Sequence, residues 1–133
     1  MVILGLMASV LYPDYSDYMR QRRLKDAALA VTLDLMLARA QAVSMNRNVS
    51  VIFSQSPSNR YTYDAAGNAV TKDIQSNLGF YDVTLSADNN PIFSSRGIAR
   101  NAQGTNPVAT VTFSNPGGTK TVTVNIAGQV VQN

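Results

Sequence analysis

The sequence predicts an α+β fold in which one long N-terminal helix packs on an antiparallel β-sheet or β-sandwich. Three observations support this prediction. The first twelve residues are almost wholly apolar, the segment from Ser16 to about Asn46 has the spacing of an amphipathic helix, and the rest alternates between short β-branched stretches and turn residues. Strands that follow one long helix are typical of an α+β domain whose helix lies on the sheet.

The apolar start, MVILGLMASVLY, has no polar face. A helix that is apolar all round must lie in lipid or inside an assembly. We therefore assign its large apolar residues to an assembly or membrane helix: Val2, Ile3, Leu4, Leu6, Met7, Val10 and Leu11. Twelve residues cover roughly 18 Å at about 1.5 Å each, whereas a spanning helix needs about 20 residues. We expect this segment to belong to a longer hydrophobic helix.

A secretory signal peptide is the alternative interpretation of this start. A signal peptide has a basic region before its apolar stretch and a small-x-small cleavage site after it. Nothing basic precedes the stretch here, and the residues that end it are Val10-Leu11-Tyr12-Pro13. The signal-peptide interpretation is therefore disfavoured.

The next segment predicts a helix with an apolar stripe. Its apolar residues recur at alternating spacings of four and three, as Leu24, Ala28, Val31, Leu35, Ala38, Ala42 and Met45. A second set widens the stripe: Leu29, Leu33, Met36, Leu37, Ala40 and Val43. Pro13 fits a kink or a first turn, with Asp14, Ser16 or Asp17 as a cap. We divide the chain into an assembly segment, 1–23, and a globular domain, 24–133, whose helix packs through Leu24, Val31, Leu35 and Ala38.

The remaining sequence predicts antiparallel strands. Strand candidates cover 48–53, 60–63, 69–71, 82–85, 91–94, 109–113, 119–126 and 129–131. Turn residues separate them, above all Asn115-Pro116-Gly117-Gly118 between the two clearest strands and Gly128 before the last.

The composition argues against an enzyme. The chain has 133 residues and a net charge of +3, and it contains no histidine, cysteine or glutamate. The usual general bases, zinc ligands and thiol nucleophiles are therefore absent, and no S-x-x-K or G-x-S-x-G motif occurs. We predict no catalytic activity, no bound metal and no cofactor. Most of the eight aspartates are interpreted as caps, turns or solvated positions.

One dense basic run, Arg20, Arg22, Arg23 and Lys25, follows the apolar start. These residues are candidate contacts for phosphate or for lipid headgroups. The alternative is a solvated helix face, or salt bridges within an assembly, with nearby aspartates at positions 14, 17 and 26 as counter-charges. We favour the second interpretation because exposed pairs contribute little free energy.

The stretch ILGLMASVLYPDYSDYMRQRRLKDAA, residues 3–28, resembles the N-terminal helix of the type IV pilin superfamily. In that family an apolar helix contains a glycine, reaches a proline eight residues later and continues as an amphipathic helix. Gly5 and Pro13 keep this spacing, and Tyr15 stands where an aromatic residue commonly follows. The turn IFSSRG (92–97) and the ending TVTVNIAGQVV (121–131) resemble the GspH/FimT-like minor pilins and pseudopilins within that superfamily.

The resemblance implies a pilin-like fold and a structural subunit of a type IV pilus or a type II secretion pseudopilus. Its partners would be other pilin or pseudopilin subunits and, before assembly, the bacterial inner membrane, with the C-terminal domain in the periplasm. Gly5 and Pro13 would weaken the helix so that it melts on assembly; alternatively, they only curve it. The Gly5 and Pro13 register implies about nine further residues before Met1, among them the docking glutamate and the processing site.

Two alternatives remain within this resemblance. The chain could be a tip-located pilin that captures DNA or another partner, or a major filament subunit. Some DNA-binding relatives carry arginines after the final glycine, whereas Gly128 is followed by Gln129, Val130 and Val131. Nucleic acid is therefore a disfavoured partner, and the choice between pilus and secretion system stays open.

Overall fold

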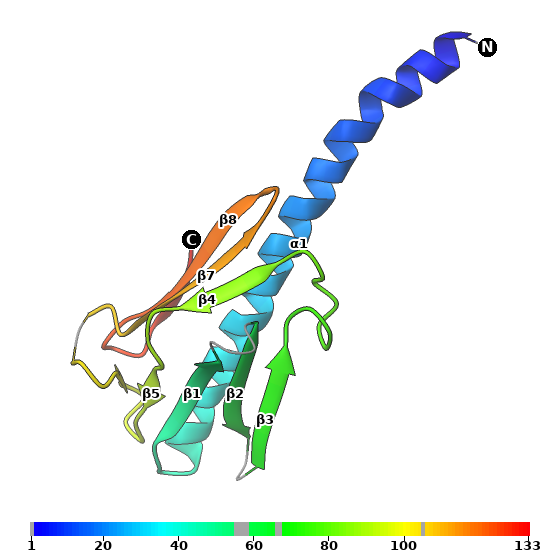
Figure 1. The fold of residues 1–133 in the computed structure, drawn as a ribbon. Helices are drawn as coiled ribbons and strands as arrows, with labels where there is room; N and C mark the ends of the chain where they lie inside the picture. The colour runs from blue at the N-terminus through cyan, green and yellow to red at the C-terminus, as the bar shows by residue number, and fades with distance from the viewer. Residues whose placement is uncertain (1, 55–58, 66–67, 105) are drawn as a thin grey trace.

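We determined the fold from a computed structural model. It describes the backbone of residues 2–54, 59–65, 68–104 and 106–133, and the side chains of residues 15–53, 59–64, 68–104 and 106–133. The first element, α1 (Val2–Ser44), is a single helix of 43 residues. Its C-terminal part lies along the strands and its N-terminal part extends beyond them (Figure 1). The predicted α+β fold class is confirmed.

Helix α1 differs from the prediction at both ends. Pro13 lies inside the helix and not in its first turn, because the backbone is already helical from Val2. A proline removes one helical hydrogen bond, and the turns on either side continue without it. The helix ends at Ser44, two residues before the predicted end. Asn46 adopts a left-handed φ of 52°, while the Arg47 amide donates to the Ala42 carbonyl at 3.1 Å. These are the features of a Schellman motif, which terminates a helix.

The strands form two antiparallel sheets. The first contains β1 (Val49–Ser54), β2 (Arg60–Ala65), β3 (Asn68–Asp73), β5 (Ile92–Phe93) and β6 (Ala99–Arg100), in the order β3-β2-β1-β5-β6. The second contains β4 (Thr84–Ala87), β7 (Ala109–Asn115), β8 (Gly118–Val124) and β9 (Val130–Gln132), in the order β4-β7-β8-β9. Every pairing between neighbouring strands is antiparallel.

Three strand predictions need correction. Strand β6 was not predicted, because two residues are too few to show an alternating pattern. Strand β4 begins at Thr84 and not at residue 82, since the Val83 amide donates to the Phe80 carbonyl in a turn. Strand β8 ends at Val124, and the Ile126 carbonyl instead accepts a hydrogen bond from the Ala99 amide of β6 at 3.0 Å.

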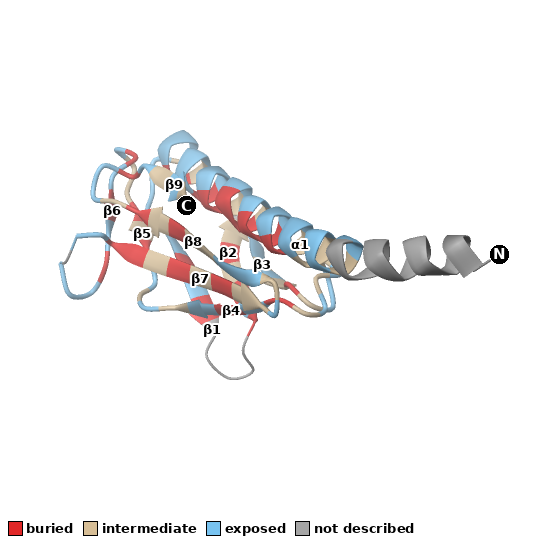
Figure 2. Ribbon diagram, turned by 90° about the horizontal axis from the view of Figure 1, so that it is seen from above, coloured by how far each residue is buried: buried red, intermediate tan, exposed pale blue. Residues whose placement is uncertain are grey.

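The core lies between α1 and the two sheets. The helix buries Leu24, Ala27, Ala28, Val31, Leu35, Ala38 and Ala42. This is the first of the two predicted sets, with Ala27 added and with Met45 left partly exposed. The second set, which was predicted to widen the stripe, is exposed instead. Figure 2 shows the buried stripe on the side of α1 that faces the strands. Phe93, Phe113 and Tyr61 are the largest fully buried side chains that the sheets contribute. The predicted packing through Leu24, Val31, Leu35 and Ala38 is confirmed.

Candidate assembly surface

The basic run on α1 does not act as one cluster. Arg20 pairs with Asp17 at 3.3 Å, and Arg22 approaches Asp26 at 3.9 Å, as the interpretation of a balanced helix face expected. Arg23 instead turns inward toward Asp82, a residue that lies 59 positions later in the chain. The run is thus divided between two short-range pairs and one tertiary contact. Lys25 has no ion pair with any side chain that the structure describes.

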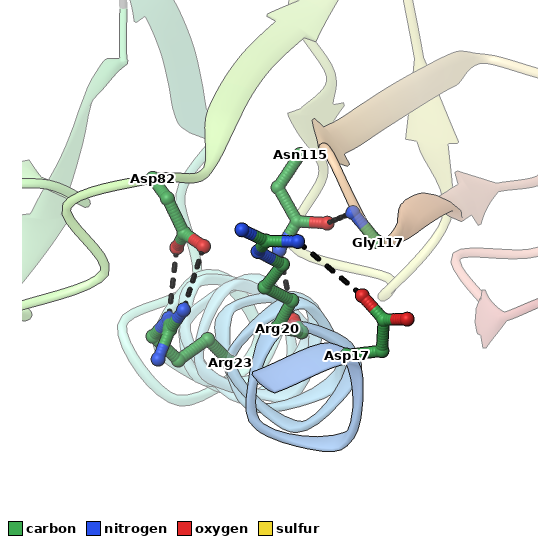
Figure 3. Close-up of polar contacts among 6 residues, drawn as sticks. All are labelled: Asp17, Arg20, Arg23, Asp82, Asn115 and Gly117. Atoms are coloured by element: carbon green, nitrogen blue, oxygen red, sulfur yellow. Dashed lines mark hydrogen bonds and ion pairs between the residues drawn. The ribbon is translucent and has the colours of Figure 1, made fainter. Parts of the chain in front are cut away.

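The Arg23–Asp82 pair fixes the β3–β4 connection to the helix. Arg23 Nε donates to Asp82 Oδ1 at 2.9 Å, and Nη2 donates to Oδ2 at 2.8 Å (Figure 3). The side chains are only 21% and 15% exposed, and the guanidinium lies 4.8 Å from the centre of the Tyr81 ring. The hydrogen bonds from Arg23 lower the pKa of Asp82, and the same bonds raise the pKa of Arg23. Such a bidentate pair is geometrically specific as well as strong.

The β7–β8 turn also rests on the helix, beside this pair. The Asn115 side-chain amide donates to the Arg20 carbonyl at 2.8 Å, and its oxygen accepts from the Gly117 amide at 2.8 Å (Figure 3). A Cβ atom on Gly117 would lie 2.8 Å from the Arg20 Cβ atom, so the turn touches the helix here through a glycine. The second sheet is therefore docked on α1 one turn before the first buried leucine, Leu24.

A polar cluster lies where α1 crosses the first sheet. Asp34 accepts hydrogen bonds from the Tyr61 hydroxyl and from Lys72 Nζ, the latter at 3.0 and 3.1 Å. Burial and the bond to Asp34 raise the pKa of Tyr61. Burial opposes the charge on Lys72, but the bond to Asp34 prevails and raises its pKa. Each polar group here has a partner, so the cluster joins helix to sheet and offers no free nucleophile.

The prediction that most of the eight aspartates are caps, turns or solvated positions leaves three that are shielded from solvent. Asp34, Asp73 and Asp82 lie in ion pairs with side chains at most 17% exposed, and none is simply a solvated position. Asp73 also accepts from the Gln75 and Ser76 amides; these bonds and the pairing with Arg60 lower its pKa. Within the described residues, no three histidine, cysteine, aspartate or glutamate side chains are grouped so that they could hold a metal ion.

The outer face of α1 is apolar although it is exposed. Leu33 is 56% exposed, and Leu29, Met36, Leu37 and Val43 are exposed to a similar degree. These residues follow helical spacing, so they form one stripe on the side away from the core. We call Leu29, Leu33, Met36, Leu37 and Val43 the outer stripe. An apolar stripe of this length is uncommon on an isolated monomer and marks a contact surface.

The outer stripe ends at a hollow beside the C-terminal end of α1. This hollow, of about 740 Å³, is lined by Met36, Arg39, Ala40, Val43, Ser44, Arg96, Gly97, Gly128, Gln129 and Val130. Arg39 Nε donates to the Gly97 carbonyl at 2.8 Å, which holds the turn after β5 against the helix. We call it the arginine hollow, since Arg39 and Arg96 both line it.

Two glycines make the close approach at this hollow. Gly97 and Gly128 have φ angles of +80° and +79°, in the left-handed region. A Cβ atom on Gly128 would overlap the Gly97 carbonyl oxygen, and it would lie 3.0 Å from Arg39 Nε. The turn before β9 can therefore rest on the turn after β5 only with glycine at position 128.

From Val2 onward, the predicted assembly segment has helical backbone. The side chains of Val2, Ile3, Leu4, Leu6, Met7, Val10, Leu11 and Pro13 lie outside the described residues, and Gly5 falls in the same range. By length and composition alone, Tyr15–Ser44 would also pass as a membrane-crossing helix. It packs on both sheets through Leu24, Val31 and Leu35, so we interpret this part as the core helix of the domain.

The sequence interpretation missed several residues of this surface. Nothing local marks Asp82 as the partner of Arg23, or Asp34 as the partner of Lys72, because each pair joins distant segments. The turn residues Gly97 and Gly128 were noted as turns but not as neighbours. A charged residue among the buried positions of a helix, such as Asp34 on α1, is the signal that could have indicated a tertiary ion pair.

Comparison with solved structures identifies proteins of similar fold. The type IV minor pilin FimU of Pseudomonas aeruginosa is 18% identical, with a TM-score of 0.62 over 87% of this chain and 92% of that one. The minor pseudopilin EpsH from the type 2 secretion system of Vibrio cholerae is 14% identical, with a TM-score of 0.62 over 84% of this chain and 96% of that one. At these identities the likeness shows a shared fold.

No match was found among curated proteins. The family model of the type II transport protein GspH, however, matches residues 27–128, which run from the buried half of α1 to the glycine at the arginine hollow. That range covers most of the globular domain. This chain therefore belongs to the GspH family.

Proposed function

We propose that this chain is a structural subunit, a minor pilin or a pseudopilin, of a type IV pilus or a type II secretion pseudopilus. The observation that carries the proposal is membership of the GspH family together with a helix that begins in an almost wholly apolar stretch. FimU is described as a minor pilin and EpsH as a minor pseudopilin, which supports the minor role over that of a major subunit.

We propose different roles for the two segments of the chain. Residues 1–23 would form the assembly and membrane segment, and residues 24–133 the globular domain. Before assembly, Val2, Ile3, Leu4, Leu6, Met7, Val10 and Leu11 would lie in the inner membrane, with the domain in the periplasm. In the filament they would pack against the helices of other subunits. Each large apolar residue so buried gains about 1.5–3 kcal/mol, enough for a bundle to hold without covalent links.

Two sets of residues have proposed roles in this cycle. Gly5 and Pro13 would let the helix melt locally, since glycine and proline cost about 1 and 3 kcal/mol in a helix interior. Arg20, Arg22 and Lys25 are the candidates for headgroup or phosphate contacts before assembly. Arg23 is a weaker candidate than the sequence suggested, because its guanidinium is occupied by Asp82.

A tip-located subunit that captures DNA has less support. The residues after Gly128 are Gln129, Val130 and Val131, and they add no basic side chain. We also propose no catalytic activity and no bound metal, since the chain lacks histidine, cysteine and glutamate. Stoichiometric metal in native mass spectrometry would contradict this part of the proposal.

Truncation tests the proposal directly. A chain that lacks residues 1–19 keeps Arg23, Leu24 and the rest of the packed helix, so we expect a soluble, folded monomer. It should no longer sediment with membranes or enter filaments, whereas the full chain should do both. A truncated chain that still enters filaments would overturn the role of the apolar segment. Unfolding of the β-strands, seen by circular dichroism, would overturn the proposed division at residue 23.

A further inference from the structure

Only some of the basic side chains of this domain form ion pairs. Six basic side chains form ion pairs with aspartates. Among the described side chains, five others have no such partner: Lys25, Arg39, Arg96, Arg100 and Lys120. Arg39 and Arg96 line one and the same hollow, although they come from α1 and from the turn after β5. Two guanidinium groups at one hollow favour an incoming anion.

The geometry points to a docking site: we propose that the arginine hollow receives an acidic side chain carried on an apolar segment of a different subunit of the same filament. The inference rests on the proposed function and names the chemistry of one contact within it. The acidic group would meet Arg96 and the free Nη atoms of Arg39. The apolar side chains beside it would cover Met36, Val43 and the rest of the outer stripe.

The lining of the hollow favours a protein segment as the occupant. Met36, Ala40, Val43 and Val130 contribute apolar surface beside the two arginines. The outer stripe continues this surface along the helix through Leu33 and Leu29, all of it exposed. A segment with one carboxylate and several apolar side chains matches both features. Arginines beside apolar contacts are also typical of the central parts of protein interfaces.

A lipid headgroup fits poorly because of distance. Arg39 lies 28 residues beyond Leu11 on one helix, or roughly 42 Å along its axis. The polar layer on either side of a bilayer is much thinner, at about 5–8 Å. A nucleic acid also fits poorly, since a polyanion binder presents a longer basic stripe than two arginines around an apolar hollow.

A second copy of this chain fits less well than a different subunit. Every described aspartate except Asp88 already forms an ion pair, and Asp88 accepts a hydrogen bond from the Thr110 amide. The chain also has a net charge of +3, so two copies repel each other. A different subunit with a carboxylate outside any ion pair therefore fits the hollow better than a second copy does.

A crosslinking experiment tests the identity of the occupant. The sequence has no cysteine, so an introduced cysteine is the single thiol of this chain. The full chain with Met36→Cys, which places the label in the arginine hollow, is labelled with a benzophenone maleimide in filament-producing cells and irradiated. Ile52→Cys on β1 is the control, because the exposures of the two native side chains match at 47% and 50%. We expect Met36→Cys, and not Ile52→Cys, to form an adduct with a different pilin-like subunit.

Charge reversal tests the role of the arginines. Combined with Met36→Cys, Arg96→Glu should reduce the adduct at least tenfold. Arg100→Glu removes another unpaired arginine that does not line the hollow, and it should leave the adduct unchanged. Replacing the partner's acidic residue near the mapped crosslink by lysine should restore the adduct with Arg96→Glu. Arg39 is left intact, because its bond to Gly97 supports the fold.

Several outcomes would overturn the inference. These are a Met36→Cys adduct with a second copy, with phospholipid or with nucleic acid, the absence of an adduct, or an Arg96→Glu adduct at the original level. Incorporation of the full chain into filaments is followed in the same cells. If the chain enters filaments and the adduct fails, only this inference is wrong; if the chain never enters filaments, the proposed function is wrong as well.

Discussion

Arg23 and Asp82 face each other with two parallel hydrogen bonds of 2.9 and 2.8 Å, although 59 positions separate them in the chain. The pair ties the β3–β4 connection to α1 at the point where the helix enters the domain (Figure 3). Hydrogen bonds to charged groups are worth about 1.5–3 kcal/mol each when they are shielded from water. This contact should therefore contribute measurably to the free energy of unfolding of the domain.

We predict that Asp82→Asn lowers the free energy of unfolding by about 1–3 kcal/mol at pH 7. The pKa of Asp82 is lowered in the folded chain, so its stabilisation is present above the unfolded value of about 3.9 and is lost as the pH falls through the folded pKa. Between pH 5 and strong acid, the variant should therefore lose less stability than wild type. The difference should equal the contribution of the Arg23–Asp82 pair to the free energy of unfolding. Thermal unfolding of the full chain in nonionic detergent measures both effects.

Asp17→Asn serves as the control for this prediction. Its pair with Arg20 is also seen in the structure, but the Asp17 side chain is 65% exposed. Exposed pairs contribute about 0–1 kcal/mol. An equal effect of the two substitutions would mean that the shielded geometry of Arg23 and Asp82 adds nothing.

Leu35→Asp should unfold the globular domain, and Leu33→Asp should not. Leu35 is 1% exposed between α1 and the strands, so an aspartate there places an unpaired charge in the core. Leu33 lies on the outer stripe of the same helix and is 56% exposed. Circular dichroism melting compares the two variants, which carry the same substitution. If both melt like wild type, the assignment of the buried face of α1 is wrong.

Gly128→Ala should cost about 2–4 kcal/mol of stability. The alanine Cβ atom would overlap the Gly97 carbonyl oxygen, and the left-handed φ of +79° adds strain. Gly79→Ala is a matched control, since Gly79 has the same φ and nothing lies within 4 Å of its added Cβ atom. The control should show the backbone strain alone, about 1–2 kcal/mol. Denaturant unfolding of both variants isolates the contact with Gly97.

Tyr61→Phe should destabilise the domain by about 1–2 kcal/mol near neutral pH, because the Tyr61 hydroxyl donates to Asp34. Burial and this bond raise the pKa of Tyr61 above its ordinary value of about 10. Its stabilisation is thus complete below about pH 10 and is lost as the pH rises toward the folded pKa. Wild type should therefore lose stability in strong base more steeply than Tyr61→Phe, as urea unfolding at several pH values would measure. Tyr18→Phe, at a 60% exposed position, should leave the neutral-pH stability unchanged.

Much of the fold was predictable because its signals are local. The spacing of Leu24, Val31 and Leu35 marks the buried face of α1 through the helical period alone, and the strands on either side of Pro116-Gly117 follow from alternation and turn chemistry. The end of α1 was less predictable. It depends on the left-handed conformation of Asn46, a property that asparagine permits but does not require.

The sequence by itself determined the apolar start, the amphipathic helix, the strand-rich remainder and the absence of histidine, cysteine and glutamate, because each depends on residue type and short-range spacing. Tertiary structure decided which charges meet. Arg23 has Asp26 nearby on its own helix but pairs with Asp82, and Lys72 on β3 pairs with Asp34 on α1. It also brought Arg39 and Arg96 to one hollow, where Gly128 permits the turns to touch. These contacts depend on how the sheets pack on the helix, because no repeating spacing in the sequence indicates which distant segments pair.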